Sequence, residues 1–290
     1  MSKDCLHKYL VLDRQARVIT VYAKDVVNEY INNVHPTPVA SAAMGRLLCA
    51  TLMMGSTLKG KESMMVSIDG NGPIGVLKAE ANCNGDVRGF VSNPYVDLPL
   101  NDKGNLDVAK AVGQDGFINV TKQLNMKEPF VGSCNLISGE IGEDISYYYG
   151  MSEQTPTVVA LGILIDKDHS CKVAGGFMIQ MLPKASEEAY EEVEKLVYNI
   201  KSVSNMLEKV DGDSSKIIDL LFKDNELILE NDVRWHCDCS YEKALSLLSH
   251  LKKEELEEEI NHGGANVTCN FCQKSYHINV DDISKLIKEK

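Results

Sequence analysis

Four cysteines near the end of the chain constrain its fold more than any other feature. Cys237 and Cys239 form a C-x-C pair, Cys269 and Cys272 form a C-x-x-C pair, and 29 residues separate the two pairs. Two short cysteine pairs that a fold brings together provide the four soft, tetrahedral ligands of a structural zinc site. The usual zinc ribbon has two C-x-x-C pairs about 15 to 20 residues apart, so this pattern is a variant of it. The sequence therefore predicts one zinc ion, bound by these four cysteines, in a small C-terminal domain over residues 233–290.

The remaining cysteines are expected to be ordinary reduced thiols. The N-terminus, Met1–His7, lacks the apolar segment of a signal peptide, and no run of 18 apolar residues predicts a transmembrane helix. We therefore expect a cytoplasmic protein with no membrane partner. Thiols are kept reduced in the cytoplasm, so a disulfide framework is not expected. The five other cysteines are scattered along the chain, and they are Cys5, Cys49, Cys83, Cys134 and Cys171.

The charge of the chain argues against nucleic acid as a partner. The formal net charge is −12, and residues 233–290 carry eight Lys and Arg against ten Asp and Glu. A protein that binds the phosphates of DNA or RNA needs a basic surface. A nucleic-acid-binding zinc module is therefore disfavoured.

Residues 1–182 are predicted to form an α+β domain dominated by antiparallel strands. Runs rich in β-branched and aromatic residues alternate with turn signals, which indicates hairpins. Two stretches have helical spacing, Ala23–Val34 and Val39–Leu58, and the second is typical of a closely packed core helix. The predicted strands are Tyr9–Asp13, Val18–Tyr22, Met64–Asp69, Val76–Ala81, Val87–Val91, Phe117–Thr121, Val131–Ser138, Ile145–Tyr149, Val158–Ile165 and Lys172–Met181.

The stretch Gly70–Gly75 matches the dinucleotide-binding pattern G-x-G-x-x-G after a strand. That pattern requires a following helix whose N-terminus holds the pyrophosphate. Here the strand-like run Val76–Ala81 leads to a hairpin-turn signal at Asn84–Gly85, and Pro73 removes one backbone donor from the loop. Strand, turn and strand is the better interpretation, so nucleotide binding is not predicted.

Residues 183–232 are predicted to form an acidic helical linker. Six Lys stand against thirteen Asp and Glu between residues 184 and 232. Ser186 precedes a helix start, apolar residues recur at helical spacing as far as Leu207, and Asp211–Asp213 interrupts the pattern before a second short helix. Short, strongly charged helices are marginal alone, so neighbouring structure is one way to hold this segment in place. An ordinary helical linker is the alternative.

The region of the cysteines carries its own predicted elements. A helix-rich insert is predicted over Glu242–Ile260, a strand over Ser275–Val280, and a terminal helix that begins at Asp281 or Asp282. With four cysteines present, we expect the nearby histidines to lie outside the ligand set. These histidines are His236, His262 and His277.

No catalytic set is recognisable in the sequence. Glu140, Glu143 and Asp144 lie in a predicted loop without a partnering histidine or nucleophile, and we expect them to be solvated turn residues. His35 and His169 also lie in predicted turns. Because no Ser/His/Asp or Cys/His arrangement has a recognisable spacing, the chain is not expected to be an enzyme.

Six short motifs, spread over essentially the whole chain, occur in the order of a known family. They are Asp69-Gly-Asn-Gly-Pro-Ile-Gly75, Val91-Ser-Asn-Pro94, Ser138-Gly-Glu-Ile-Gly142, Ala174-Gly-Gly-Phe-Met-Ile-Gln180, Trp235-His-Cys-Asp-Cys-Ser240 and Val267-Thr-Cys-Asn-Phe-Cys-x-x-x-Tyr276. On these motifs the chain resembles the heat-shock protein 33 family, redox-regulated chaperones of the bacterial cytoplasm. All four cysteine positions of the family are kept, whereas the five other cysteines are not part of its motifs.

The resemblance implies a stress-activated chaperone of the holdase type, which needs no ATP. In such a protein the reduced, zinc-bound form is inactive. Oxidation pairs neighbouring cysteines, here Cys237 with Cys239 and Cys269 with Cys272, and zinc is released. The switch domain and the linker then unfold and expose surface that binds unfolded client proteins and prevents their aggregation. Family members are dimers in the active form, so a homodimer is implied.

Other classes of protein stay open on the sequence. In a structural zinc domain the cysteines would only staple the fold. A thiol–disulfide oxidoreductase also uses C-x-x-C, but its pair opens a helix in a thioredoxin-like βαβ unit, whereas Cys269–Cys272 follows a turn at Gly263–Gly264. A zinc hydrolase needs an open coordination position, which four thiolates close.

Overall fold

The computed structural model describes residues 3–210 and 212–289, so Met1, Ser2, Asp211 and Lys290 lie outside the described residues. The chain separates into two compact units, Met1–His236 and Cys237–Lys290, which we call the N-terminal and C-terminal units. Residues 183–232 belong to the N-terminal unit. The division into three regions, with borders after residues 182 and 232, stays a prediction.

Sheet A of the N-terminal unit pairs strands from both ends of that unit. Its antiparallel strands are β1 (Cys5–Val11), β2 (Ala16–Tyr22), β8 (Thr157–Ile165), β9 (Cys171–Met181) and β10 (Asn225–Asp232). Among the described residues their order is β10-β1-β2-β9-β8. The two predicted hairpins, β1–β2 and β8–β9, are confirmed. β10 was not predicted, and it pairs along the outer edge of β1.

Sheet B is antiparallel except at one edge. Its strands are β3 (Ser63–Asp69), β4 (Leu77–Asn82), β5 (Asp86–Val91), β6 (Phe117–Gln123), β7 (Phe130–Asn135) and β11 (Arg234–Trp235). Within the described chain their order is β11-β5-β4-β3-β6-β7. Burial alternates along β3, β4 and β5, so one face of this sheet is turned to the core. β11 pairs with β5 in parallel and brings the end of the N-terminal unit into the sheet.

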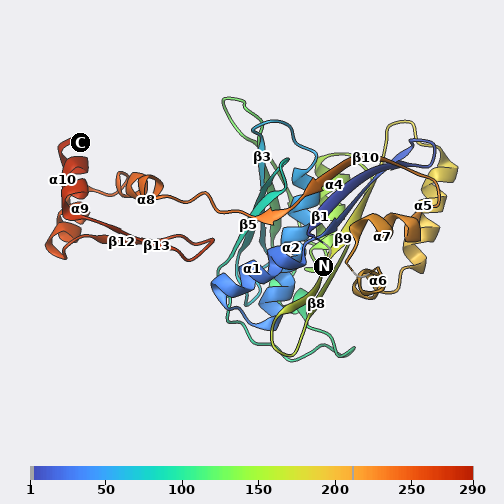
Figure 1. Cartoon of the computed structure of the whole chain (residues 1–290), viewed down its shortest axis with the longest axis horizontal. Helices are drawn as coiled ribbons and strands as arrows, with labels where there is room; N and C mark the ends of the chain where they lie inside the picture. The colour runs from blue at the N-terminus through green and yellow to red at the C-terminus, as the bar shows by residue number, and fades with distance from the viewer. Residues whose placement is uncertain (1–2, 211, 290) are drawn as a thin grey trace. The chain divides into compact units, whose positions relative to one another are not determined.

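A long helix fills the space between the two sheets (Figure 1). α2 (Pro38–Gly55) packs into the main hydrophobic core with α1 (Lys24–Val34) and with strands of both sheets. At Gly45 a Cβ atom would lie only 3.3 Å from side-chain atoms of Ile163 and Val27, which explains the small residue there. α2 is long and apolar enough to cross a membrane, but 89% of it is buried inside the protein. The predicted core helix is therefore confirmed.

The glycine-rich loop at Gly70–Gly75 joins two strands, as predicted, and leads from β3 into β4. Its glycines allow close backbone packing. A Cβ atom on Gly70 would lie 2.4 Å from the carbonyl oxygen of Val112, and one on Gly72 would lie 2.3 Å from that of Ala111. Both carbonyls belong to the short helix α3 (Val108–Val112). Close contact with α3 therefore explains these glycines.

Two predictions are wrong in the segment after β7. The predicted strand Ile145–Tyr149 is part of a helix, α4 (Gly142–Ser152), and Asp144 is fully buried instead of solvated. The Asp144 carboxylate accepts hydrogen bonds from the backbone amides of Ile137, Ser138 and Ile141. These bonds satisfy the buried carboxylate and fix the turn from which α4 begins. The aromatic run inside α4 favoured a strand when its local pattern was considered alone.

Three short helices cover the face of sheet A that is turned away from α2 (Figure 1). They are α5 (Glu187–Asn199), α6 (Val203–Lys209) and α7 (Ser214–Leu221). A serine or aspartate side chain caps each N-terminus. A second hydrophobic core joins these helices to β1, β2 and β9, and on the helices it includes Val193, Leu207, Ile217, Ile218 and Leu221. Packing against sheet A therefore holds these helices in place.

The C-terminal unit is small. Its elements are α8 (Tyr241–Leu248), α9 (Lys253–Asn261), β12 (Ala265–Thr268), β13 (Ser275–Ile278) and α10 (Val280–Glu289). β12 and β13 form an antiparallel hairpin across the second cysteine pair. The hydrophobic core of the C-terminal unit consists of Ala244, Leu248, Leu256, Ala265, Ile278 and Ile283. A core of this size is small for a stable domain, so we expect a metal ion or a cross-link to contribute to its stability.

Asp4 is a buried carboxylate beside the start of α1. One of its oxygens accepts a hydrogen bond of 2.8 Å from the Val26 amide, and the other has no hydrogen-bond partner among the described residues. Burial raises the pKa of Asp4 to about 6. In an unfolded chain the pKa of an aspartate is about 3.9. The stability that this group contributes is therefore full below about pH 4, and it is lost as the pH rises through about 6.

We expect Asp4→Asn to remove this pH dependence, because asparagine still accepts from the Val26 amide and cannot ionise. The unfolding free energy of the variant minus that of wild type should be roughly 2–3 kcal/mol more positive at pH 7.5 than at pH 4. Urea unfolding at both pH values measures this. Asp13→Asn, in the exposed β1–β2 turn, is the control. An equal pH dependence in wild type and Asp4→Asn would contradict the prediction.

Candidate metal centre

The two cysteine pairs lie in loops of the C-terminal unit. Cys237 and Cys239 lie in the segment that precedes α8, and Cys269 and Cys272 lie in the turn between β12 and β13. In that turn the Cys269 amide donates to the carbonyl of Lys274, at 2.9 Å. The hairpin and the approach to α8 therefore set the positions of the two pairs independently of each other.

The four Sγ atoms form one cluster. They all lie within 4.8 Å of one another, with 3.6 Å between Cys237 and Cys269 and 3.4 Å between Cys239 and Cys272. Zinc–sulfur bonds of ~2.3 Å in a tetrahedron place the sulfurs about 3.8 Å apart, so these separations fit a bound metal ion. None of the four cysteines forms a disulfide among the described residues. The sulfurs of a disulfide would lie about 2.05 Å apart. The cluster is thus a reduced, four-sulfur site that could hold a metal ion.

The surroundings make the four thiols unequal as acids. Burial raises the pKa of Cys237, and it raises that of Cys272 to about 12. Burial also acts on Cys239, but hydrogen bonds from Tyr276 and the neighbouring cysteines outweigh it and lower the pKa of Cys239 to about 7. One thiolate therefore forms readily, and its charge opposes the ionisation of the others. A cation is needed to favour four thiolates together, so metal binding should release protons and strengthen with pH.

Tyr276, on β13, directly supports the cluster. Its hydroxyl lies 3.2 Å from the Sγ atom and 2.9 Å from the carbonyl oxygen of Cys239. The hydrogen bond to Cys239 raises the pKa of Tyr276 to about 12, so the hydroxyl keeps its proton and can donate it to the thiolate. Tyr276 ends the last of the six sequence motifs, and the motif alone predicts no role for it. Its place four residues after Cys272, on the strand that returns past the cluster, is the signal that points to one.

The three nearby histidines lie at the surface. His236 and His262 are exposed, and so is His277, whose Nδ1 lies 3.0 Å from Oδ1 of Asn266. The group of potential metal ligands at this site contains only cysteines among the described residues. The expectation that histidine does not replace a cysteine ligand stays a prediction.

The second cysteine pair lacks the setting of a thiol–disulfide catalyst. Cys269 and Cys272 lie in a turn between two strands, whereas a thioredoxin-like pair opens a helix whose N-terminus lowers the pKa of the attacking thiol. The geometry of the pair therefore favours metal binding over disulfide exchange.

The chain just before the first cysteine pair is firmly held in the N-terminal unit. Trp235, on β11, is buried there, and its ring centre lies 6.0 Å from that of Tyr30. The His236 amide donates to the carbonyl of Val87 at 2.9 Å, and this residue directly precedes Cys237. A change in backbone conformation at Cys237 would therefore act on β11 through the chain itself.

Comparisons with known proteins all indicate the same protein family. The model of the Hsp33 protein family matches residues 4–279. The 33 kDa chaperonin of Staphylococcus carnosus is 40% identical over 291 residues, which cover 100% of this chain and 99% of that protein. The 33 kDa chaperonin of Bacillus cytotoxicus is 41% identical over 288 residues, which cover 99% of each.

A solved structure is similar over the full length. The crystal structure of the 33 kDa chaperonin (heat shock protein 33 homolog) of Thermotoga maritima matches with a TM-score of 0.92 and 33% identity, and the match covers 99% of each chain. The predicted α+β fold class is therefore confirmed.

Proposed function

Because this chain belongs to the Hsp33 family, we propose that it is a redox-regulated, ATP-independent chaperone that holds unfolded proteins. The observation that carries the proposal is the cluster of four Sγ atoms, reduced and within 4.8 Å of one another, in a unit with a small core. The relatives are named as chaperonins and not as enzymes, and we expect no catalytic activity.

In the reduced state we assign Cys237, Cys239, Cys269 and Cys272 as the ligands of one zinc ion. Bound zinc would favour the thiolate form of all four sulfurs and contribute binding free energy of about 10 kcal/mol or more to the folded unit. The Tyr276 hydroxyl would orient the Cys239 sulfur. Since the apolar core of this unit is small, its fold would depend on the four cysteines staying reduced.

Oxidation would act on the cysteines themselves. Two thiolates give two electrons to an oxidant and form one S–S bond, and hypochlorous acid takes up the electrons and a proton to yield chloride and water. We propose the disulfides Cys237–Cys239 and Cys269–Cys272, which join neighbours in the sequence. Sulfurs bonded to each other no longer provide four thiolate ligands. The unit would lose its metal and the free energy that stabilised it.

Unfolding of the C-terminal unit would loosen residues 183–232, to which it is joined through β11. α5, α6 and α7 contain only 13, 7 and 8 residues. Isolated helices shorter than ~12–15 residues are marginal in water. Their release would uncover the second hydrophobic core, in which Tyr9, Phe177 and Ile179 are now buried on sheet A. We propose that these apolar faces of sheet A and of the helices bind clients.

The test follows zinc and chaperone activity in one sample. Zinc-loaded, reduced protein is treated with hypochlorite, a chromogenic chelator reports the zinc released, and light scattering reports aggregation of a heat-denatured client. We expect stoichiometric zinc release together with suppressed aggregation, both reversed by thiol reductant plus zinc. Zinc that stays bound, or that leaves without any gain in client holding, would refute the redox proposal and leave the cluster as a structural staple.

A matched variant controls for oxidation elsewhere. Cys83 is half-buried and is not part of the four-cysteine cluster. Its thiol donates a hydrogen bond to the carbonyl oxygen of Gly60. Cys83→Ser should therefore release zinc and hold clients on oxidation as wild type does.

Reduction of insulin by the wild-type protein would favour a thiol–disulfide oxidoreductase instead.

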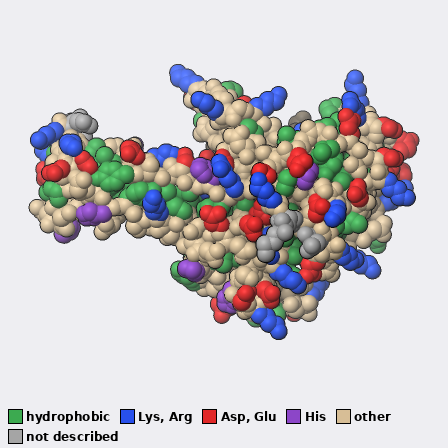
Figure 2. All heavy atoms as spheres, viewed as in Figure 1, with side chains coloured by type: hydrophobic (Ala, Val, Ile, Leu, Met, Phe, Trp, Pro, Cys, Tyr) green, Lys and Arg blue, Asp and Glu red, His purple; other side chains and the backbone are tan. Residues whose placement is uncertain are grey.

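We further propose that the active form is a homodimer in the cytoplasm and that neither nucleic acid nor nucleotide is a partner. The net charge of −12 supports the exclusion of nucleic acid. On the face that Figure 2 shows, basic side chains lie interspersed with acidic ones instead of gathered in one area. Sedimentation before and after oxidation tests the dimer. Salt-sensitive binding of RNA would contradict the proposed exclusion.

A further inference from the structure

A second group of metal-ligating side chains lies in the N-terminal unit. Cys5 and His7 share one face of β1, and Glu230 on β10 is the direct cross-strand partner of His7. One ligand atom from each residue lies within 4.8 Å of the other two. His7 Nε2 lies 3.9 Å from Cys5 Sγ and 3.9 Å from Glu230 Oε1. The pairing of β1 with β10 therefore gathers a thiol, an imidazole and a carboxylate from opposite ends of the N-terminal unit.

A chain of hydrogen bonds orients the His7 ring for ligation. The Ser214 hydroxyl donates to the carbonyl oxygen of Cys5 at 3.2 Å, and its oxygen lies 2.9 Å from His7 Nδ1. Because the hydroxyl proton is directed at the carbonyl, the oxygen accepts from Nδ1–H, and Nε2 carries the free lone pair. That lone pair faces Cys5 and Glu230. Support of this kind at the far nitrogen is typical of metal-bound histidine.

The group borders a cavity of about 440 Å³. His7 is buried, Cys5 is half-buried and Glu230 is exposed, so a cation can enter from solvent past the carboxylate. The cavity leaves room for a further ligand. Zinc sites with three protein ligands keep a fourth position for water.

We propose that Cys5, His7 and Glu230 bind a divalent transition-metal ion of the zinc class, with water in the fourth position. Thiolate, imidazole and carboxylate are ligands that zinc accepts together. Zinc bonds of ~2.0–2.3 Å in a tetrahedron separate such ligand atoms by about 3.3–3.6 Å, so small side-chain movements close the observed distances. The Cys5 thiol donates to the Asn231 carbonyl at 3.3 Å, and ligation releases this proton to solvent.

The site would connect parts of the chain that are far apart in sequence. Cys5 and His7 lie on β1, and Glu230 lies on β10. Ser214, which supports His7, is the first residue of α7. An ion that binds only the folded arrangement stabilises it by RT ln(1 + [M]/Kd). Metal binding would therefore strengthen the attachment of residues 214–232 to β1, whether or not the redox proposal is correct.

The experiment titrates reduced, full-length protein, loaded with only one equivalent of zinc for the four-cysteine cluster, with cobalt(II). Cobalt binds such ligands more weakly than zinc does, so it leaves the four-cysteine cluster occupied by zinc. We expect one further equivalent to bind, with a thiolate-to-cobalt charge-transfer band and slower hydrogen exchange over residues 214–232. Cys5→Ser should abolish the band. Glu230→Gln should weaken cobalt binding by at least about 10-fold.

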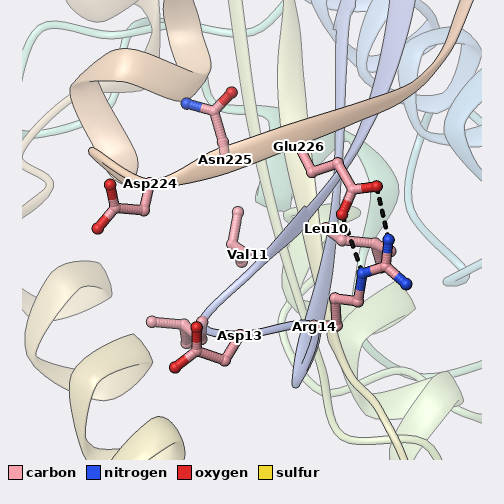
Figure 3. A pocket seen from close by; sticks show the side chains of 8 residues that line it. Leu10, Val11, Asp13, Arg14, Asp224, Asn225 and Glu226 are labelled. Atoms are coloured by element: carbon pink, nitrogen blue, oxygen red, sulfur yellow. Dashed lines mark hydrogen bonds and ion pairs between the residues drawn. The ribbon is translucent and has the colours of Figure 1, made fainter.

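Glu226 provides the matched control on the same strand. Its carboxylate accepts hydrogen bonds of 2.9 Å and 2.7 Å from Arg14 beside a separate hollow at the β1–β2 turn (Figure 3). Glu226→Gln removes one β10 carboxylate and leaves the Cys5 group intact, so cobalt binding should be unchanged.

Two results would overturn the proposal. One is the absence of cobalt binding beyond the zinc already present, and the other is unchanged binding in both Cys5→Ser and Glu230→Gln. Cys269→Ser separates this proposal from the proposed function. That variant should keep the cobalt site in the N-terminal unit even though its four-cysteine cluster is broken.

Discussion

Cys269→Ser is expected to lose tight zinc binding and, with it, the folded C-terminal unit. A serine hydroxyl does not replace a thiolate for zinc, and the other three sulfurs would lack one corner of the tetrahedron. We expect zinc affinity to fall by more than about 100-fold, since loss of an outer-shell partner alone costs roughly 10–100-fold. Competition with a chelator measures the affinity. Proteolysis and amide hydrogen exchange over residues 237–289 measure folding.

The N-terminal unit gives the internal reference for this prediction. The two hydrophobic cores of the N-terminal unit contain none of the four cluster cysteines. The amides of α2 should therefore stay protected from hydrogen exchange in the variant. Cys83→Ser should bind zinc like wild type, which shows that loss of a thiol as such is harmless. Wild-type zinc affinity in Cys269→Ser would disprove the four-ligand assignment.

Gly162→Ala is expected to make the reduced, zinc-bound protein an active chaperone, if the proposed function is correct. Gly162 on β8 pairs with Gly175 on β9, and α6 lies against this flat site. A Cβ atom on Gly162 would lie 2.5 Å from the amide nitrogen of Ser204 and 2.8 Å from the carbonyl carbon of Val203. Because both are backbone atoms, α6 must move away from β8. The Leu207 side chain on α6, which is fully buried, would then lose its packing in the second hydrophobic core.

The expected result is suppression of client aggregation without oxidant, to a level near that of oxidised wild type. Loss of Leu207 burial alone costs about 1.5–3 kcal/mol, which is large for a helix of seven residues. Light scattering measures client holding, and hydrogen exchange over residues 203–209 reports whether α6 has been released.

Gly150→Ala on α4 is the matched substitution, because its Cβ atom would meet nothing within 4 Å. It should be silent in both assays, or slightly stabilising as alanine favours a helix. If exchange shows that α6 is released in Gly162→Ala and the reduced variant still fails to hold clients, this segment does not mask the client-binding surface.

Local patterns were enough to predict most strands and the core helix. The β1–β2 and β8–β9 hairpins follow from β-branched runs that flank turn residues, and α2 follows from its continuous apolar composition. The four-cysteine cluster was also predictable, because each pair is local in the sequence and zinc chemistry requires the two pairs to meet.

Features that depend on distant partners were not predictable in this way. β10 is rich in Asn, Asp and Glu, which are poor strand formers, and it is a strand because it pairs with β1. α4 depends on the buried Asp144 carboxylate, whose role appears only when its three backbone donors are in place. The Cys5, His7 and Glu230 group likewise exists only through strand pairing, so no sequence motif announces it.

The order of strands in sheet A has a consequence for synthesis of the protein. β1 is translated before the other strands of this sheet, yet its outer neighbour is β10, whose residues are translated last among them. At ~5–20 residues per second the edge of β1 waits roughly 10–40 s for that neighbour. During this interval the nascent hairpin presents an unpaired edge of the kind that recruits other extended chains. A message truncated before the codon of Asn225 would yield a product in which β10 never covers that edge.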